Sequence, residues 1–448
     1  MNQEPNRPFT RRAFLRSALS GAGVLSVGAL LAACGGGAAP AASPSRAASS
    51  AAPASTPASS AAAAPSSPAA SPSASAAATT KNSKELKIGI LAATTGSLAA
   101  IGQDINRGTD LYLDQHKGSF AGLEVTVLRE DETTNPATGL LKARKLIEQD
   151  KVDAIMGIVS SATALAVRDT IDKAKIPLII SNAAANDMTG AKKSKYIFRT
   201  SFSSWQAGTS LAKWTAQHVG KKALVMGPDY AAGHEIVDGF VGTFKQYGGE
   251  ILGQVFPPLG NSDYGPYLGK VKTTQPEVVW AFFSSGDAQK FVQQYGQFVG
   301  TGIPLVGYAL NDEKVVRALG KAMLAVKSCD HCWDSALDNP ENKAMVEAYV
   351  KKYNEEPNIV ETQWDGMYLL DKALQMTSGD KSADALVTAM EKVPKWNSPR
   401  GPVYIEPESH GLVQRFYRFA TIEEGGKYHN KVGEILGVFT PSKMIAEK

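Results

Sequence analysis

From Leu86 onward, short apolar runs alternate with longer segments of helical periodicity. The runs "LKIGIL", "LEVTVL", "VDAIMGIV" and "IPLIIS" have six or eight residues each, which is typical of buried strands. Between them, apolar residues recur every three or four positions, as they do along one face of a helix. The predicted helices span 101–116, 136–150 and 161–175. Alternating strands and helices predict βαβ units and a parallel sheet.

The same order of elements then starts again. "KALVMG", "GEILGQVF", "EVVWAFFS" and "IPLVGY" are predicted strands, separated by helices at 233–247, 264–273 and 287–298. The segments 176–181 and 303–308 both open with Ile-Pro-Leu, and both take the fourth strand position of their series. Proline is tolerated where a strand begins. We therefore predict an α/β protein of two similar lobes, with a ligand cleft at the carboxyl ends of the strands.

Beyond the second series the pattern is less regular. Helices are predicted at 341–354, 362–377 and 382–391. The remaining tail contains "GPVYIEP", "LVQRFYRFA" and "KYHNKVGEILGVF", which are strand-like.

The N-terminal part of the chain has a different composition. From Gly35 to about Ser83 the residues are almost all Ala, Pro, Ser, Gly and Thr, without a single aromatic side chain. Such a segment cannot bury enough apolar surface to offset the entropy of folding. Its prolines favour an extended, semi-stiff chain. We interpret residues 34–83 as a tether that holds the folded part away from a membrane.

Residues 1–33 are interpreted as a signal peptide. "TRRAFLR" resembles the twin-arginine export signal, with Arg11 and Arg12 as the pair, and "LAAC" resembles a bacterial lipobox, in which Cys34 is acylated. The apolar stretch 18–33 is short for a spanning helix, which disfavours the alternative of an uncleaved anchor. Acyl chains contribute about 0.8 kcal/mol per buried CH₂, so more than one chain anchors a protein stably. The sequence predicts an extracytoplasmic, lipid-anchored protein.

The charge distribution argues against nucleic acid as a partner. The chain carries a formal charge of +4, and four arginines and one glutamate before Cys34 give that segment +3 of it. The remainder is close to neutral and has no basic stripe.

A search for catalytic and metal-binding motifs finds no complete one. "GIVSSA" lacks the second glycine of G-x-S-x-G, and "HEIVD" has Asp238 where a zinc-protease helix carries its second histidine. Gly220-Lys221 and Gly320-Lys321 lack the upstream glycine of a phosphate-binding loop. We predict no enzymatic activity, no cofactor and no metal.

"CDHC", from Cys329 to Cys332, allows three interpretations. In an oxidising compartment, two cysteines at this spacing most often form a local disulfide, whose short loop gives modest stabilisation. Free thiols are the second interpretation. A metal site that uses Cys329, His331 and Cys332 is the third.

Ser160 and Ser161 lie between a predicted strand and a predicted helix. Hydroxyls and unpaired N–H groups at a helix start form a ready anion site. An ordinary helix cap is the alternative interpretation of the same residues.

The folded part resembles the branched-chain amino-acid-binding proteins, the soluble receptors of ABC importers. The resemblance is carried by "LKIGILAATTGSLAAIGQDINRGTDLYL", "VDAIMGIVSSATALAV", "IPLIISNAAANDMTG", "YIFRTSFSSWQAG" and "DYAAGHEIVDGF", and it extends from Leu86 to the C-terminal strands. It implies two Rossmann-like lobes joined by three chain crossovers. By matching segments, lobe one is placed at 84–202 and 330–402, and lobe two at 203–329 and 403–448. "SCDHC" falls beside the second crossover.

The resemblance also implies a ligand site. Ser161, with Ser160 beside it, would hold a substrate carboxylate, and the backbone of Ala183 and Ala185 would add contacts. Ala309 stands where the family carries the carboxylate that pairs with an α-ammonium group, and the nearby Asn311 and Asp312 could substitute for it. The predicted walls of the cleft are Trp205, Tyr230, Ser284 and Tyr308.

These residues predict capture of a carboxylate-bearing solute, either an amino acid or an aromatic or aliphatic acid. The expected partners are the solute, the permease and ATPase subunits of an ABC importer, and the membrane through the lipid anchor. We expect a monomer. The alternative function is a sensory receptor of the same fold that serves a signalling partner, and an enzyme is the third choice.

Overall fold

The computed structural model describes residues 84–329 and 333–445 of the 448-residue chain. The predicted signal peptide, the tether with Cys34, and Cys332 lie outside the described residues. The export, lipidation and disulfide predictions therefore stay predictions. None of the helices in the described ranges combines the length and apolarity that a membrane crossing requires.

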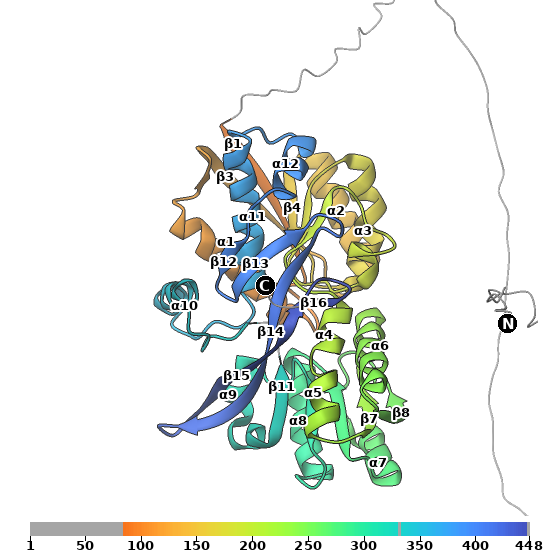
Figure 1. Cartoon of the computed structure of the whole chain (residues 1–448). Helices are drawn as coiled ribbons and strands as arrows, with labels where there is room; N and C mark the ends of the chain where they lie inside the picture. The colour runs from red at the N-terminus through yellow and green to blue at the C-terminus, as the bar shows by residue number, and fades with distance from the viewer. Residues whose placement is uncertain (1–83, 330–332, 446–448) are drawn as a thin grey trace, which may run out of the picture. The chain divides into compact units, whose positions relative to one another are not determined.

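The first lobe is built on a sheet with the strand order β2-β3-β1-β4-β5-β6. All neighbouring pairs are parallel except β2 with β3. Helices α1 and α11 pack against each other on one face, and α2 and α3 cover the other face (Figure 1). The elements are β1 (Glu85–Ala92), α1 (Ala99–Gln115), β2 (Ser119–Phe120), β3 (Leu123–Asp131), α2 (Pro136–Arg144, continued by a π-helical turn at Lys145–Gln149), β4 (Ala154–Gly157), α3 (Ser161–Ala174), β5 (Leu178–Ile180), a 3₁₀ turn (Asn186–Thr189) and β6 (Ile197–Arg199).

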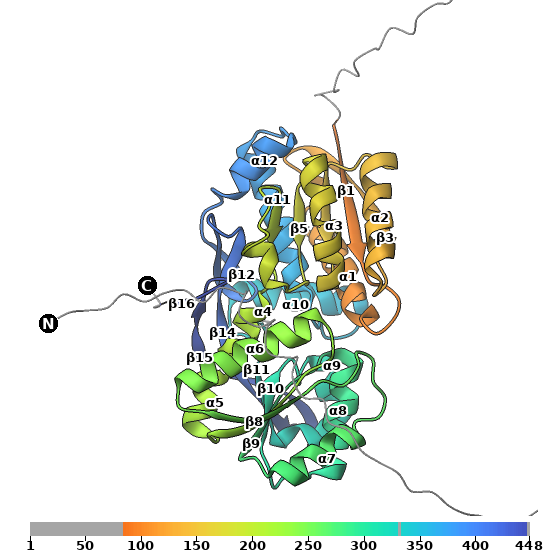
Figure 2. The ribbon, with the colours of Figure 1, turned by 90° about the vertical axis from the view of Figure 1, so that its right-hand side faces the viewer.

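The second lobe repeats this plan with the parallel strand order β11-β10-β9-β7-β8. Figure 2 shows α5 and α6 on one side of this sheet and α8 and α9 on the other. The elements are α4 (Ser204–Ser210), α5 (Ala212–His218), β7 (Lys222–Met226), α6 (Ala231–Gln246), β8 (Glu250–Val255), α7 (Gly265–Thr274), β9 (Val278–Phe282), α8 (Ser285–Phe298), β10 (Leu305–Tyr308), α9 (Glu313–Leu319), a 3₁₀ turn (Gly320–Ala325) and β11 (Val326–Cys329).

A long strand, β14 (Gly411–Glu424), connects the two sheets (Figure 1). Its first residue pairs with Arg199 of β6, and Phe419 farther along pairs with Ser328 of β11. Fourteen extended residues span roughly 45 Å, which is long enough to follow the edges of both sheets. The remaining C-terminal elements are α10 (Pro340–Tyr353), α11 (Glu361–Met376), α12 (Ala383–Met390), β12 (Trp396–Ser398), β13 (Gly401–Glu406), β15 (Lys427–Phe439) and β16 (Met444–Ile445).

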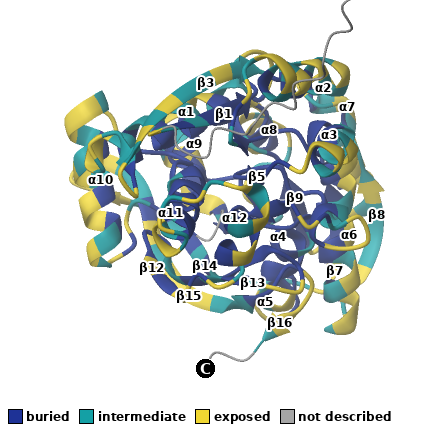
Figure 3. Cartoon of the chain, turned by 90° about the horizontal axis from the view of Figure 1, so that it is seen from above, coloured by how far each residue is buried: buried dark blue, intermediate teal, exposed yellow. Residues whose placement is uncertain are grey.

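The central strands of both lobes are covered on both faces. Every residue of β4, β5 and β9 is buried, and Figure 3 shows β5 and β9 in dark blue between more exposed helices. Parallel strands buried on both faces read as continuous apolar runs, which is the pattern found in the sequence. The predicted two-lobed α/β fold is confirmed, and the two Ile-Pro-Leu segments become β5 and β10.

Helices α4 and α5 and strand β11 were not predicted from the sequence. Six of the seven residues of α4 are buried although most of them are polar or small, so apolar periodicity gives no signal. Ser203 and Gln206 instead form a capping box that starts the helix. Gly208 lets α6 approach closely, because a Cβ there would lie 2.0 Å from the Ile236 carbonyl oxygen.

Candidate ligand-binding site

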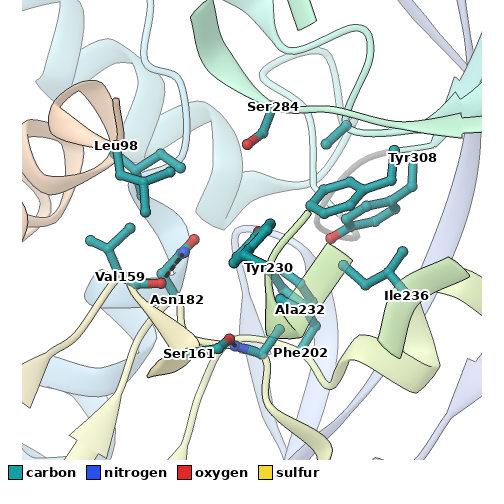
Figure 4. A pocket seen from close by; sticks show the side chains of 14 residues that line it. Leu98, Val159, Ser161, Asn182, Phe202, Tyr230, Ala232, Ile236, Ser284 and Tyr308 are labelled. Atoms are coloured by element: carbon teal, nitrogen blue, oxygen red, sulfur yellow. Dashed lines mark hydrogen bonds between the residues drawn. The ribbon is translucent and has the colours of Figure 1, made fainter. Parts of the chain in front are cut away.

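A cavity lies between the two lobes, at the carboxyl ends of their parallel strands (Figure 4). It contains about 410 Å³ of space free of protein atoms, with the open solvent at its mouth included. The first lobe contributes Leu98, Ile101, Val159, Ser161, Asn182 and Ala184. The second lobe and the crossover before it contribute Phe202, Tyr230, Ala232, Ile236, Phe282, Ser284, Tyr308 and Ala309.

Four helices begin at this cavity. Leu98, Tyr230 and Ser284 are the N-cap residues of α1, α6 and α8, and Ser161 is the first residue of α3. Each helix follows a parallel strand, so its N-terminus necessarily lies at the carboxyl edge of the sheet. A helix N-terminus carries about half a positive charge and N–H groups without intrahelical acceptors. None of the described residues that line the cavity is charged, so the helix ends dominate its potential and favour a small anion.

The backbone before α3 aims this helix at the cavity. Gly157 has a φ of +108°, and a Cβ at this position would lie 2.5 Å from the Leu91 carbonyl oxygen. Only glycine meets both conditions. Ser160 then caps the helix, because its Oγ accepts the N–H of Thr163 at 3.4 Å. Ser160 is thus an ordinary N-cap and lies outside the cavity lining.

Ser161 faces the cavity and is 2% exposed. Its Oγ accepts the N–H of Ala184 at 3.1 Å. A serine hydroxyl has one proton and two acceptor positions. Because an acceptor position holds the Ala184 contact, the Ser161 proton is available for a solute carboxylate.

A buried carboxyl group supports the start of α3. Glu132 is 0% exposed, and its Oε1 accepts the N–H groups of Val159 and Ser160. Burial raises the pKa of Glu132 to about 7, although these hydrogen bonds oppose the shift. Near neutral pH this carboxyl is therefore protonated in a large fraction of molecules. In that form it does not oppose an anion at the adjacent helix end.

Aromatic side chains form the wall on the second-lobe side (Figure 4). The rings of Phe202 and Tyr308 meet edge to face with centroids 5.5 Å apart, and Phe282 lies 5.8 Å from Tyr308. Tyr230 adds a half-buried phenol, and burial raises its pKa so that it stays a protonated donor. Such a wall provides flat apolar contact together with hydroxyl groups.

Several polar contacts link the lobes, and two of them join α1 to α9 and Asn186 to α6. Lys314 of α9 donates to Asp104 of α1 at 2.9 Å, and Asn358 donates to the other oxygen of Asp104 at 2.9 Å. Asp104 is 0% exposed, and its burial raises its pKa against the opposing effect of Lys314. The Asn186 N–H donates to Glu235 of α6 at 2.9 Å.

Four of the nine predicted ligand-binding residues line this cavity: Ser161, Tyr230, Ser284 and Tyr308. Ala309, which was expected where the family carries a carboxylate, lines it as well. Contact of these side chains with a solute stays a prediction.

Ala183 and Ala185 lie one residue to either side of a lining residue, Ala184. The Ala183 N–H donates to the Ile158 carbonyl at 2.8 Å, so this predicted ligand donor is already used. The Ala185 carbonyl accepts from the buried Arg199 at 2.8 Å. The chain therefore presents Ala184, rather than its neighbours, to the cavity.

Trp205 and Asn311 also lie outside the lining. The Trp205 ring contacts Phe439 edge to face, with centroids 6.3 Å apart, so it packs within the second lobe. Asn311 donates from Nδ2 to Asn430 Oδ1 at 3.0 Å and borders a separate, smaller cavity.

Nine further lining residues were not predicted as site residues from the sequence. Most are apolar and give no chemical signal. Asn182 could have been found, because it follows β5 directly and strand ends are where ligand contacts gather in this fold. The nine are Leu98, Ile101, Val159, Asn182, Ala184, Phe202, Ala232, Ile236 and Phe282.

The remaining motifs take structural places. His234 of "HEIVD" pairs with Asp229 at 2.8 Å and stacks on Phe256. Cys329 ends β11 with its Sγ 3.0 Å from Ser210 Oγ. Within the described ranges, no three His, Cys, Asp or Glu residues are grouped so as to hold a metal ion.

Comparisons with known proteins agree with this architecture. A profile of the periplasmic binding proteins matches residues 85–427. The chain is 29% identical over 355 residues to the Leu/Ile/Val-binding protein homolog 6 of Brucella abortus, covering 77% of this chain and 90% of that protein.

Two solved structures are also similar. Both are solute-binding proteins of ABC transporters from Rhodopseudomonas palustris. One, from strain BisB5, is in complex with 3,4-dihydroxybenzoic acid (30% identity, TM-score 0.76, 81% of this chain and 99% of that one). The other is in complex with benzoate (31% identity, TM-score 0.74, 81% and 98%).

Proposed function

Because the chain belongs to the periplasmic binding protein family that includes the Leu/Ile/Val-binding proteins, we propose that it captures an aromatic carboxylate for an ABC permease. Membership of this family implies binding of a solute outside the cytoplasm. No bond is made or broken. The work consists of closing two lobes around the solute by hinge bending and releasing the solute unchanged.

The observation that carries the proposal is the convergence of four helix N-termini on a cavity without charged lining residues. This potential attracts a carboxylate. It also disfavours an α-ammonium group, since a buried cation requires an anionic partner. Ala309 occupies the place where the family's carboxylate is expected and cannot supply one. A simple acid therefore fits better than a zwitterionic amino acid.

The aromatic character of the solute is supported by the wall around Tyr308. Phe202, Phe282 and Tyr230 surround it, and aromatic rings pack favourably edge to face or offset-stacked. Two relatives at about 30% identity bind benzoate and 3,4-dihydroxybenzoate. Both ligands combine one carboxylate with one flat ring, which is the combination proposed for this cavity.

For the clamp we assign one lobe to 84–202 and 330–402, and the other to 203–329 and 403–448. The three crossovers between these segments would serve as the hinge. The long strand β14 supports this assignment, because it pairs with strands of both sheets.

A ligand panel measured by calorimetry and thermal shift tests the proposal. Benzoate and its hydroxylated forms should bind with micromolar affinity, near −8 kcal/mol. At a solute concentration about one hundred times Kd, they should stabilise the protein by about 2.7 kcal/mol. Leucine, isoleucine and valine at the same concentration should leave the melting temperature unchanged. Stabilisation by these amino acids and by none of the acids would contradict the proposal.

We also propose that Cys34 is acylated after export and that residues 34–83 act as the tether. Mass spectrometry of the mature protein should find its N-terminus at Cys34, carrying acyl chains. A Cys34→Ala variant should be recovered from the soluble extracytoplasmic fraction, because without acyl chains nothing would hold the tether to the bilayer. A wild-type mature chain without lipid would contradict this.

A further inference from the structure

Among the described residues that line the cavity, Asn182 carries the buried side-chain oxygen that has no hydrogen-bond partner. It follows β5, is 8% exposed, and lies on the first-lobe wall beside Val159 and Leu98 (Figure 4). Its Nδ2 donates to the Val159 carbonyl at 3.2 Å. Its Oδ1 has no hydrogen-bond partner among the described residues.

The contact with Val159 fixes which end of the amide is which. If the amide were turned over, Oδ1 would face the Val159 carbonyl oxygen, and two acceptors would be opposed. The amide oxygen is therefore the atom that points away from the Val159 carbonyl and has no partner among the described residues. A buried acceptor without a donor is costly, and native structures rarely leave one unsatisfied.

A bound solute can supply the missing donor, and its chemistry is restricted. A carboxylate has only acceptor atoms, so it cannot pair with Asn182 Oδ1 and must bind at donors such as the Ser161 hydroxyl. An ammonium group is disfavoured by the four helix N-termini and by the absence of charge among the described lining residues. A neutral O–H or N–H group remains.

We propose that Asn182 is a specificity residue that selects aromatic acids carrying a ring hydroxyl or another neutral donor over the unsubstituted acid. Ser161 and Asn182 thus recognise different parts of one solute, the carboxylate and the donor. This inference rests on the proposed function. Asn182 directly precedes three alanines, Ala183, Ala184 and Ala185, so the sequence places a polar amide where its neighbours are apolar.

The test is calorimetric titration of the full chain, wild type and Asn182→Leu, with benzoate, 3- and 4-hydroxybenzoate and the two matching methoxybenzoates. The wild type should bind at least one hydroxybenzoate about 10 to 100 times more tightly than benzoate. This factor corresponds to the free-energy penalty for leaving a buried acceptor unpaired when benzoate binds. The matching methoxybenzoate should bind no more tightly than benzoate, because its added group has no hydrogen-bond donor.

In Asn182→Leu, the ratio of the Kd for benzoate to the Kd for hydroxybenzoate should fall toward one. Hydroxybenzoate loses its partner, and benzoate no longer leaves an acceptor unpaired. Leucine has the same branching as asparagine, and circular dichroism checks the fold. Asn182→Ala, which matches the neighbouring alanines, should give the same fall and serves if the leucine variant does not fold.

Three results would overturn the inference. If both variants still prefer hydroxybenzoate over benzoate, a residue other than Asn182 makes the selection. If the wild type binds benzoate and both hydroxybenzoates equally tightly, the protein makes no such selection. Tighter binding of leucine than of any acid would mean that the donor is an ammonium group. Failure of every acid to bind is a separate outcome, which overturns the proposed function and this inference together.

Discussion

A Ser161→Ala variant is expected to bind an aromatic carboxylate about 5 to 150 times more weakly than the wild type. The change removes the hydroxyl proton that faces the cavity, so a solute oxygen is buried without its donor, at a cost of about 1–3 kcal/mol. It also leaves the Ala184 N–H without the acceptor that it now contacts at 3.1 Å. Titration calorimetry measures the affinity, and urea unfolding measures the stability.

Ser160→Ala is the matched control for this prediction. It removes the neighbouring hydroxyl, which caps α3 through the Thr163 N–H and does not line the cavity. Loss of an N-cap typically costs about 1 kcal/mol of stability. We therefore expect Ser160→Ala to lower stability by about 1 kcal/mol but to reduce affinity far less than Ser161→Ala does. An equal loss of affinity in both variants would contradict the assignment of Ser161 as the carboxylate anchor.

A Lys314→Met variant is expected to weaken the closed arrangement of the lobes. The change leaves Asp104, which is 0% exposed, without its cation. Orphaning a buried charge costs about 3–5 kcal/mol. We expect about 2–3 kcal/mol here, because Lys314 is about one-third exposed and Asn358 still donates to Asp104.

The weaker closure of the lobes in Lys314→Met should appear as faster dissociation of the solute and as a larger radius of gyration in small-angle scattering without solute. Lys272→Met, which removes an exposed lysine from α7, is the control and should change neither quantity. Asp104→Asn combined with Lys314→Met should recover part of the loss, because the orphaned charge is gone. Unchanged scattering and unchanged dissociation in Lys314→Met would contradict a role for this ion pair in closure.

Several residues of the candidate site could be predicted from the positions of the strand ends in the sequence. Ser161, Ser284 and Tyr308 come at or just after the strands "VDAIMGIV", "EVVWAFFS" and "IPLVGY". The carboxyl ends of parallel strands meet at one edge of a sheet, so such residues gather in one place. Tyr230 follows the same rule after β7. For these residues, position along the chain was sufficient.

The predicted residues that lie outside the cavity lining differ from the lining residues in details that sequence spacing does not encode. Ala183, Ala184 and Ala185 are chemically identical, and only the path of the chain after β5 turns the middle one toward the cavity. Trp205 is as good a wall residue by composition as Tyr230, but α4 directs its ring toward Phe439. Asn311 was selected for its polarity, and Asn430 of β15 holds it elsewhere.

The sequence by itself determined the two-lobed α/β architecture, because the lengths of apolar runs and the helical periodicity between them depend on local burial alone. It also predicted a cleft at the strand ends, where the cavity between the lobes lies. Tertiary structure decided which side chains face that site, that Asp104 and Lys314 meet across the lobes, and that the Asn182 amide oxygen finds no partner among the described residues. Each of these depends on how segments far apart in the chain are oriented against one another, and hydrophobic patterning carries no information about orientation.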